Sequence, residues 1–325
     1  MKMLKKMAAI LLVLMLLASA ACAEDAVRIA ALKGPTAMGL VNVMNSCDQG
    51  EKLAGASAEF TIAAAADEIT PQLIQGNLDV ACVPANLASV LYNKTEGGVC
   101  VLAVNTLGVI YIIENGETVQ SVADLKGRTI YASGKGSTPE YALAYILRSN
   151  GIDPDRDVTI EWKSEHAECL SALLADEDGI AMLPQPFVTT AMTKAPSIRV
   201  ALDLTAEWDA IQAGSETPSC LITGVMIART AYVQENPEVV AALLDAYAAS
   251  VADVNADCAA AAQLIEGYGI VAAAVAEKAI PACHIVMVEG TEMASMLSGY
   301  LAVLAEANPA SVGGKVPGAD FYYAR

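Results

Sequence analysis

The chain alternates short apolar runs of β-type residues with Ala/Leu-rich stretches of helical spacing, and this alternation constrains its fold more than any other feature. The expected strands read VRIAAL, FTIAAA, DVACVP, VCVLAVN, GVIYIIE, RTIYAS, VTIEW, GIAMLP, IRVALDL and TGVMIA. Helical patterns lie between them at residues 38–44, 69–75, 85–91 and 170–175, and the sequence from Asn236 onward is nearly all helical in pattern. This order predicts an α/β fold in which mostly parallel sheets are flanked by helices.

Two pairs of segments repeat in the same order about a hundred residues apart. Lys33-Gly34-Pro35-Thr36 follows an expected strand and opens a helix, and Lys135-Gly136-Ser137-Thr138 does the same. LDVACVPANLASVL (78–91) has a counterpart in DGIAMLPQPFVTTAM (178–192), and each is a strand that ends in a proline before a helix. The repeat predicts two similar lobes. Since ligands bind beyond the carboxyl ends of strands in open sheets, two facing lobes would aim four helix N-termini into one cleft.

The N-terminus has the pattern of a secretory signal peptide. Three lysines precede the apolar run of residues 7–17, which is too short to span a bilayer, and small residues follow through Ala23. We therefore expect residues 1–23 to be removed before Glu24, although Cys22 also fits the lipid-bearing cysteine of a lipoprotein. No later apolar run is expected to be long and uninterrupted enough to cross a membrane.

Charge and cysteine usage exclude several classes of partner. The formal net charge is −18, and it becomes −21 (−18 − 3) without the three lysines of the leader, so nucleic acid and anionic lipid would be repelled. The eight cysteines are scattered without a CxxC motif, which favours core residues over a disulfide framework and leaves one bridge open. With only two histidines, neither placed on an expected cleft loop, we expect no metal site, no cofactor and no catalytic Ser/His or Cys/His constellation.

The stretch YASGKGSTPE contains the residue types of a phosphate-binding loop, but its spacing excludes one. Lys135 is followed by Gly136 rather than by Ser or Thr, and no glycine stands five residues before Gly134. Ser137-Thr138-Pro139-Glu140 instead has the pattern of a capping box with proline in the first turn. The helix start would offer amide groups to an anion or a carbonyl oxygen, and ATP hydrolysis is not expected.

Several longer segments together resemble a known family. They are VRIAALKGPTAMGLVNVM, LIQGNLDVACVPANLASVLYNK, SVADLKGRTIYASGKGSTPEYALAYILRSNGIDP and the tail SVGGKVPGADFYY. The sequence is similar, over almost the whole mature chain, to extracytoplasmic substrate-binding proteins of ABC importers with the type II periplasmic-binding fold. The nearest branch is the nitrate/sulfonate/taurine and thiamine-pyrimidine-precursor group.

The resemblance implies a fold, a location and partners. Lobe 1 would comprise residues 24–107 and 225–325, lobe 2 would comprise residues 108–224, and a hinge would lie near residues 105–108 and 223–225. The protein would be an extracytoplasmic monomer, secreted, periplasmic or at the cell surface. It would bind a small molecule and deliver it to a membrane permease that works with a cytoplasmic ATPase.

The resemblance also implies which residues line the ligand cleft. They are Gly34, Pro35, Thr36, Met38, Pro84 and Asn86 from lobe 1, Asn105 and Thr106 at the hinge, and Gly134, Lys135, Gly136, Ser137, Thr138 and Gln185 from lobe 2. Thr36, Ser137 and Thr138 would donate hydroxyl hydrogen bonds to the ligand. These loops contain no arginine and no aromatic cage, so we expect neither a sulfonate clamp nor a pyrimidine stack, and the ligand class is a small polar organic solute.

Two other classes stay open beside transport. Menaquinone-pathway enzymes and pyrimidine-forming synthases resemble the same scaffold, and a sensor module would use the same binding fold. The chain lacks the cysteine-rich signature of the synthases, and its leader places it away from cytoplasmic metabolites. Transport is therefore the preferred interpretation.

Overall fold

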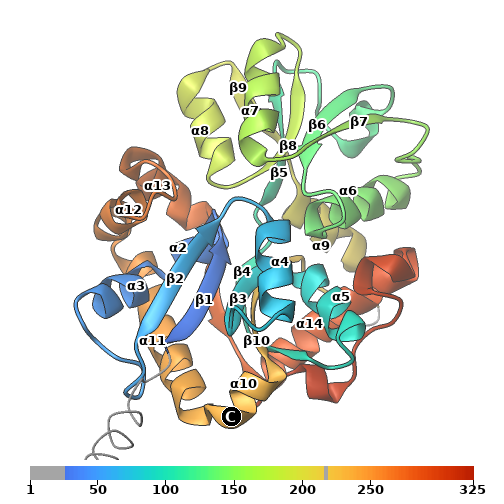
Figure 1. Ribbon diagram of the computed structural model, residues 1–325. Helices are drawn as coiled ribbons and strands as arrows, with labels where there is room; N and C mark the ends of the chain where they lie inside the picture. Colours follow the sequence, from blue (N-terminus) through green and yellow to red (C-terminus); the bar gives the residue numbers. More distant parts are fainter. Residues whose placement is uncertain (1–25, 216–218) are drawn as a thin grey trace, which may run out of the picture.

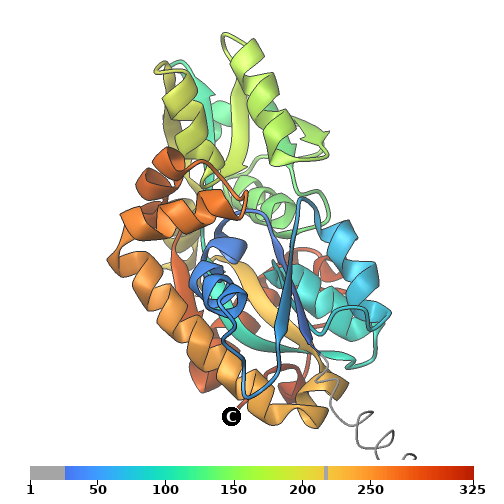
Figure 2. The same cartoon turned by 60° about the vertical axis from the view of Figure 1, so that its left-hand side comes forward.

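The protein folds into two α/β lobes, as the computed structural model of residues 26–215 and 219–325 shows (Figures 1 and 2). Figure 1 places the second lobe, in green and yellow, above the first lobe, which contains both the blue and the orange-red parts of the chain. The expected leader, its cleavage site and Cys22 lie outside the described residues.

The first lobe is built on a six-stranded sheet. Its strands are β1 (Val27–Leu32), β2 (Ala58–Ala63), β3 (Val80–Pro84), β4 (Val99–Leu107), β10 (Ile222–Arg229) and β11 (Ile285–Val288). The spatial order is β11-β4-β10-β3-β1-β2. Strand β1 pairs in parallel with β2 and β3, whereas β10 runs antiparallel between β3 and β4.

The second lobe is built on a five-stranded sheet in the order β7-β6-β8-β5-β9. Its strands are β5 (Ile110–Asn115), β6 (Thr129–Ser133), β7 (Thr159–Lys163), β8 (Ile180–Pro184) and β9 (Ile198–Asp203). Strand β6 pairs in parallel with β7 and β8, and β5 runs antiparallel to β8 and β9.

The expected two-lobed α/β class is confirmed, but both sheets are mixed rather than mostly parallel. The antiparallel members are β5 and β10, which follow a passage between the lobes, and the edge strand β11, which runs antiparallel to β4. The chain leaves the first sheet after β4 and enters the second at β5, and it returns to the first as β10, which pairs with β4 along most of its length. Strands β10 and β5 therefore run antiparallel to β3 and β8, the neighbouring strands of the βαβ units in their sheets.

Helices cover both faces of each sheet. In the first lobe they are α2 (Pro35–Met38), α3 (Val41–Asp48), α4 (Ala66–Ile74), α5 (Ala85–Lys94), α10 (Thr230–Glu235), α11 (Pro237–Ala256), α12 (Cys258–Gly267), α13 (Ala273–Ala279) and α14 (Gly290–Ala307). In the second lobe they are α6 (Thr138–Ser149), α7 (His166–Ala175), α8 (Phe187–Lys194) and α9 (Leu204–Gln212). One core cluster of the first lobe joins α3, α11, α12 and α13 to the sheet, and another joins α5 and α14 to it.

Helix α11 is long and apolar enough to cross a membrane if only its length and composition are considered, which the sequence did not lead us to expect. The apolar side of α11 packs in the core of the first lobe, where Leu243, Leu244 and Tyr247 are fully buried. Helix α11 packs against α3 and β11. It is therefore a core helix of the lobe.

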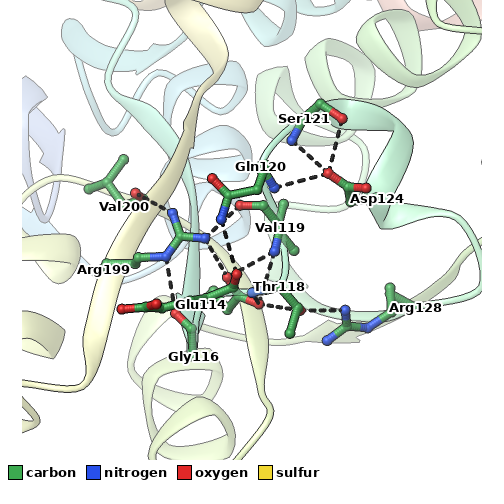
Figure 3. A network of polar contacts seen from close by, with 11 residues as sticks. Glu114, Gly116, Thr118, Val119, Gln120, Ser121, Asp124, Arg128, Arg199 and Val200 are labelled. Carbon is green, nitrogen blue, oxygen red and sulfur yellow. Dashed lines mark hydrogen bonds and ion pairs between the residues drawn. The ribbon is translucent and has the colours of Figure 1, made fainter.

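A buried ion pair fixes the outer end of the second sheet (Figure 3). The Glu114 carboxylate accepts from Thr118 N at 2.8 Å and from Val119 N at 3.1 Å, and Arg199 Nη2 donates to it at 2.9 Å. Burial alone would raise the pKa of Glu114, but these hydrogen bonds and the Arg199 charge outweigh it and hold the pKa below its usual range. Strand β5, the following turn and β9 are thereby tied together.

The lobes pack against each other beside the cleft through aromatic rings. Trp208 of α9 is fully buried, with its ring centroid 4.6 Å from that of Tyr145 on α6 and 5.5 Å from that of Tyr300 on α14 of the first lobe. On another flank, α13 of the first lobe contacts α8 of the second, as Figure 2 shows. Trp208 is thus a packing residue, and the lobes touch through more than the crossing strands.

Candidate functional site

A cleft of about 900 Å³ lies between the two sheets, at the carboxyl ends of their parallel strands. Its walls are the junctions where strands lead into helices. The first lobe contributes the junctions β1–α2, β2–α4 and β3–α5, and the second lobe contributes β6–α6, β7–α7 and β8–α8. Six junctions converge here, whereas the sequence repeat predicted four.

Ten of the fourteen expected site residues line this cleft. They are Pro35, Thr36, Pro84, Thr106, Gly134, Lys135, Gly136, Ser137, Thr138 and Gln185. Lys33, which the sequence suggested as a partner for an anion, lines it as well, and both Lys33 and Lys135 are exposed. The geometry therefore brings the two halves of the sequence repeat face to face, although their contact with a ligand remains a prediction.

Four expected residues do not line the cleft. Met38 is fully buried in the core of the first lobe, with its sulfur 4.0 Å from that of Cys283. Gly34 lies between two lining residues, Lys33 and Pro35, and its carbonyl accepts from the amides of Ala37 and Met38 at the start of α2. Asn105 is fully buried, and its Oδ1 accepts from Thr106 Oγ1 at 3.1 Å.

Asn86, the fourth, connects the lobes instead. Its Nδ2 donates to Ser311 O at 3.0 Å and to Gly136 O at 3.4 Å, and its Oδ1 accepts from Thr138 Oγ1 at 3.3 Å. Tyr300 OH donates in turn to Thr138 Oγ1 at 3.2 Å. Asn86, Thr138 and Tyr300 are all fully buried, and this network connects α5 and α14 of the first lobe to the start of α6.

The three expected hydroxyl donors all use their protons within the chain. Thr36 Oγ1 donates to Leu32 O at 2.8 Å, and Ser137 Oγ donates to Gly134 O at 2.8 Å. Thr138 Oγ1 donates to Asn86, as described above. A hydroxyl has one proton, so in this arrangement the Thr36 and Ser137 oxygens can accept a hydrogen bond from a ligand but cannot donate one, whereas the fully buried Thr138 oxygen already accepts from Tyr300.

The start of α6 also differs from the expected capping box. Ser137 does not cap the helix with its side chain, since its hydroxyl points back to Gly134 O. Glu140 reaches Gly136 N instead of the amide of Ser137. These two hydrogen bonds link the loop before α6 to the first turn of the helix, and they hold the Gly134–Gly136 turn in place beside the cleft.

Sequence reasoning missed the β7–α7 junction. Ser164, Glu165 and His166 line the cleft together with Lys163 and with Ser133, the last residue of β6. His166 Nδ1 lies 2.5 Å from Ser133 Oγ, and the ring of Phe187 lies 5.2 Å from the imidazole. The expectation that neither histidine borders the cleft was wrong. The β2–α4 junction, which has the equivalent position in the first lobe, was not predicted to line the cleft either.

Burial governs the protonation of His166. It lowers the pKa of His166 from the ordinary value of 6.5 to about 4, so the imidazole is neutral at pH 7. A neutral imidazole has one N–H donor and one acceptor nitrogen. With Nδ1 facing Ser133, the Nε2 atom can either donate or accept, depending on which way the Ser133 hydroxyl is turned.

The base of the cleft is closely packed around a glycine. A Cβ atom on Gly224 would lie 2.6 Å from Asn105 Oδ1 and 2.6 Å from Thr36 Cγ2. Gly224 pairs with Thr106 across the two crossing strands, where the sequence places the hinge. Any side chain at this position would push the crossing strands and the β1–α2 junction apart.

The described residues contain no group of three or more His, Cys, Asp or Glu side chains that could hold a metal ion. The seven cysteines in this part of the chain are free thiols, and Cys82, Cys100, Cys169 and Cys283 are buried. The disulfide that the sequence left open does not form among them.

Residues 50–278, well over half of the chain, match the family described as ABC transporter, phosphonate, periplasmic substrate-binding protein. The chain belongs to this family. It is therefore of the solute-binding class of ABC-importer components, as the sequence resemblance implied, and the family is periplasmic and binds small molecules. No curated protein matches the chain.

Solved structures share the fold at low sequence identity. An ABC transporter protein from Parabacteroides distasonis has a TM-score of 0.76 at 21% identity, over 92% of this chain and 99% of that chain. The aliphatic sulphonate binding protein SsuA from Escherichia coli gives 0.71 at 17% identity, over 91% and 96%. The alkanesulfonate-binding protein SsuA from Xanthomonas axonopodis pv. citri, bound to MOPS, gives 0.69 at 17% identity, over 91% and 96%.

Proposed function

We propose that the cleft binds a small polar organic solute outside the cytoplasm, and that the loaded protein delivers it to the permease of an ABC importer. The convergence of six strand–helix junctions, three from each lobe, on one cleft of about 900 Å³ carries the proposal. A volume of this size suits a small organic molecule. Structural neighbours include proteins named for binding sulphonates and nitrate, which are small solutes as well.

The proposed binding residues are the ten expected positions that line the cleft, together with Ser133, Lys163 and His166. In this proposal the protein acts as a monomer, and the crossing strands β4 and β10 form the hinge on which the lobes close. The permease and its ATPase are the partners. ATP is then hydrolysed elsewhere, which agrees with the interrupted phosphate-loop spacing around Lys135.

The proposed role is capture without chemical change. The contact between Ser133 and His166 has the residue types with which an enzyme could hold a nucleophile beside a base. Incubation of the purified protein with its bound compound should return that compound unchanged by mass spectrometry. A product that disappears in a Ser133→Ala variant would instead establish catalysis.

Native mass spectrometry of the purified mature protein tests the binding function directly. We expect a small molecule to be carried by the wild-type chain and to be released on unfolding. Ala65→Trp, which fills the wall at the β2–α4 junction, should abolish this occupancy. Ala175→Trp, at the exposed end of α7, is the matched control and should retain it. A wild-type protein that carries nothing and gains no thermal stability from any solute would contradict the proposal.

A further inference from the structure

The two walls of the cleft are chemically unequal at equivalent positions. In the first lobe, β2 leads into α4 through Ala64, Ala65 and Ala66, which present only methyl groups and backbone. In the second lobe, β7 leads into α7 through Ser164, Glu165 and His166. Both triplets line the same cleft, so a molecule between them meets methyl groups at the β2–α4 junction, next to Asp67 and Glu68, and polar side chains at the β7–α7 junction.

Prolines line the cleft from both lobes, since Pro139 and Pro184 of the second lobe belong to the lining as well. Pro35 and Pro71 from the first lobe line the cleft, and Pro84 closes the end of β3 beside them. Proline offers a flat apolar ring and no N–H donor. Pro35, in the first turn of α2, therefore offers no amide to a ligand, whereas Pro71 lies inside α4 and adds only apolar surface.

The polar wall centres on Ser133 and His166. Ser133 is 2% exposed, and its hydroxyl is fixed 2.5 Å from His166 Nδ1. Packing against Phe187 orients the imidazole ring. Since burial keeps the imidazole neutral, this pair recognises a head group by hydrogen bonds rather than by full charge.

The charged residues of the lining do not favour a doubly charged anion. Three lysines line the cleft, and so do three carboxylates, Asp67, Glu68 and Glu165, whereas none of the described lining residues is an arginine. Lys163 is already paired with Glu161, with 3.0 Å between Nζ and Oε2. A phosphonate dianion would therefore lack a bidentate clamp and would approach carboxylates in a strongly acidic chain.

We propose that the cleft selects an organic molecule whose polar head carries at most one negative charge and binds at Ser133 and His166, with an apolar body along the Ala64–Ala66 and proline wall. This inference rests on the proposed solute-binding function. The expected ligands are compact aliphatic or aromatic molecules with a carboxylate, an amide or a similar polar head group. Inorganic anions, which have no apolar part, and fully ionised phosphonates are not expected to bind, although the family description names phosphonate.

Calorimetric titration of the ligand-freed mature protein at pH 8 tests the head group with matched probes. Benzoate, benzamide and phenylphosphonate share one ring, butyrate and butylphosphonate share one chain, and inorganic phosphate is a head alone. We expect the carboxylate or amide of each set to bind at least about tenfold more tightly than its phosphonate, and phosphate to give no heat of binding. Tighter binding of a phosphonate or of phosphate would overturn the inference.

Variants locate the head group. Ser133→Ala should weaken binding of the best probe about tenfold, because the imidazole loses the partner that orients it. Ser171→Ala on α7 is the matched control, since its hydroxyl donates only to Ala167 O of the same helix. Equal affinities for the two variants would place the head group elsewhere and refute the subsite.

Native mass spectrometry of the same preparation distinguishes a failure of the head-group inference from a failure of the solute-binding function. If no probe binds but the protein carries a co-purified compound, the head group of that compound decides the inference: a single or absent charge supports it, and a dianion refutes it. If the protein neither carries a compound nor binds any probe, the solute-binding function itself fails.

Discussion

Asn86 Oδ1 lies 3.3 Å from Thr138 Oγ1, and this contact joins helix α5 of the first lobe to helix α6 of the second. Both side chains were expected to face a ligand. Asn86 is instead fully buried, and its side-chain amide donates to Ser311 O and Gly136 O. Thr138 lines the cleft, but its hydroxyl donates to Asn86 Oδ1. On this flank the side chains therefore join the two lobes to each other.

Replacing Asn86 should therefore destabilise the protein and loosen the lobes. Asn86→Ala leaves Ser311 O and the Thr138 hydroxyl buried without these partners, so we expect the free energy of unfolding to fall by about 2 kcal/mol. Urea unfolding measures the loss, and small-angle scattering should show a larger radius of gyration. Asn77→Ala, an exposed control, should change neither. An unchanged stability in the Asn86 variant would mean that the network contributes nothing.

Thr36 and Ser137 should affect both binding and folding. Changing either to valine removes a cleft oxygen that can accept from the ligand and leaves Leu32 O or Gly134 O without its donor. We expect ligand affinity to fall by roughly 1–2 kcal/mol and stability to fall by about 1 kcal/mol in each variant. Titration with the co-purified compound and urea unfolding measure the two effects. Thr193→Val, whose hydroxyl donates to Thr189 O at an exposed site, should leave binding intact. Normal binding by both cleft variants would show that neither oxygen touches the ligand.

His166 should make stability depend on pH in mildly acidic solution. Its pKa is near 6.5 in the unfolded chain and about 4 in the folded protein, so between these values the unfolded state binds more protons. The free energy of unfolding should fall as pH drops from 6.5 to 4, by at most about 3 kcal/mol from this residue. His166→Gln should flatten that part of the profile in urea unfolding measured at several pH values. A variant as pH-sensitive as the wild type would contradict the lowered pKa of His166 in the folded protein.

Glu114→Gln should destabilise the second lobe. The variant breaks the pair with Arg199 while the arginine remains partly buried, and we expect a loss of about 3 kcal/mol. Because the pKa of Glu114 is lowered in the folded protein, the wild-type advantage should be present above pH 4.5 and disappear as pH falls below it. Glu161→Gln, at an exposed pair on β7, should cost less than about 1 kcal/mol. Equal losses from the two substitutions would argue against a special role for the buried pair.

Gly224→Ala should disturb the base of the cleft. The new methyl group would lie 2.6 Å from Asn105 Oδ1 and from Thr36 Cγ2, so we expect a loss of about 1–3 kcal/mol in stability together with weaker solute binding. Gly214→Ala is the matched control, because a Cβ there meets nothing within 4 Å. Thermal unfolding with and without the co-purified compound measures both effects. A Gly224 variant that behaves like the Gly214 variant would show that the crossing strands can move apart freely.

The sequence predicted the fold well because its strands carry clear patterns. Each of the ten expected strands has a counterpart, and the largest displacement is that of FTIAAA, which forms the later part of β2 and the residues after it. Strand β11 was missed, since its four residues lie at a sheet edge and three of them are only partly buried. The direction of the crossing strands was also not predictable, because periodicity reports burial and not the neighbour to which a strand pairs.

The candidate site was only partly predictable for a related reason. Spacing identified the loops, and ten of the expected residues do line the cleft. It could not show which way a side chain turns within a loop, so Met38, Asn86 and Asn105 were placed in the cleft although they are buried behind it. The His166 junction escaped notice because Ala64–Ala66 and Ser164–His166 share a position in the fold but no residue types.

The chain contains two tryptophans, Trp162 and Trp208, and the second has its indole between Tyr145 of one lobe and Tyr300 of the other. Rotation of the lobes would alter the surroundings of that indole, so its emission wavelength is an intrinsic optical gauge of opening and closing. Capture of a solute could then be followed in real time without attaching any dye, which matters in a protein whose many free thiols would complicate labelling.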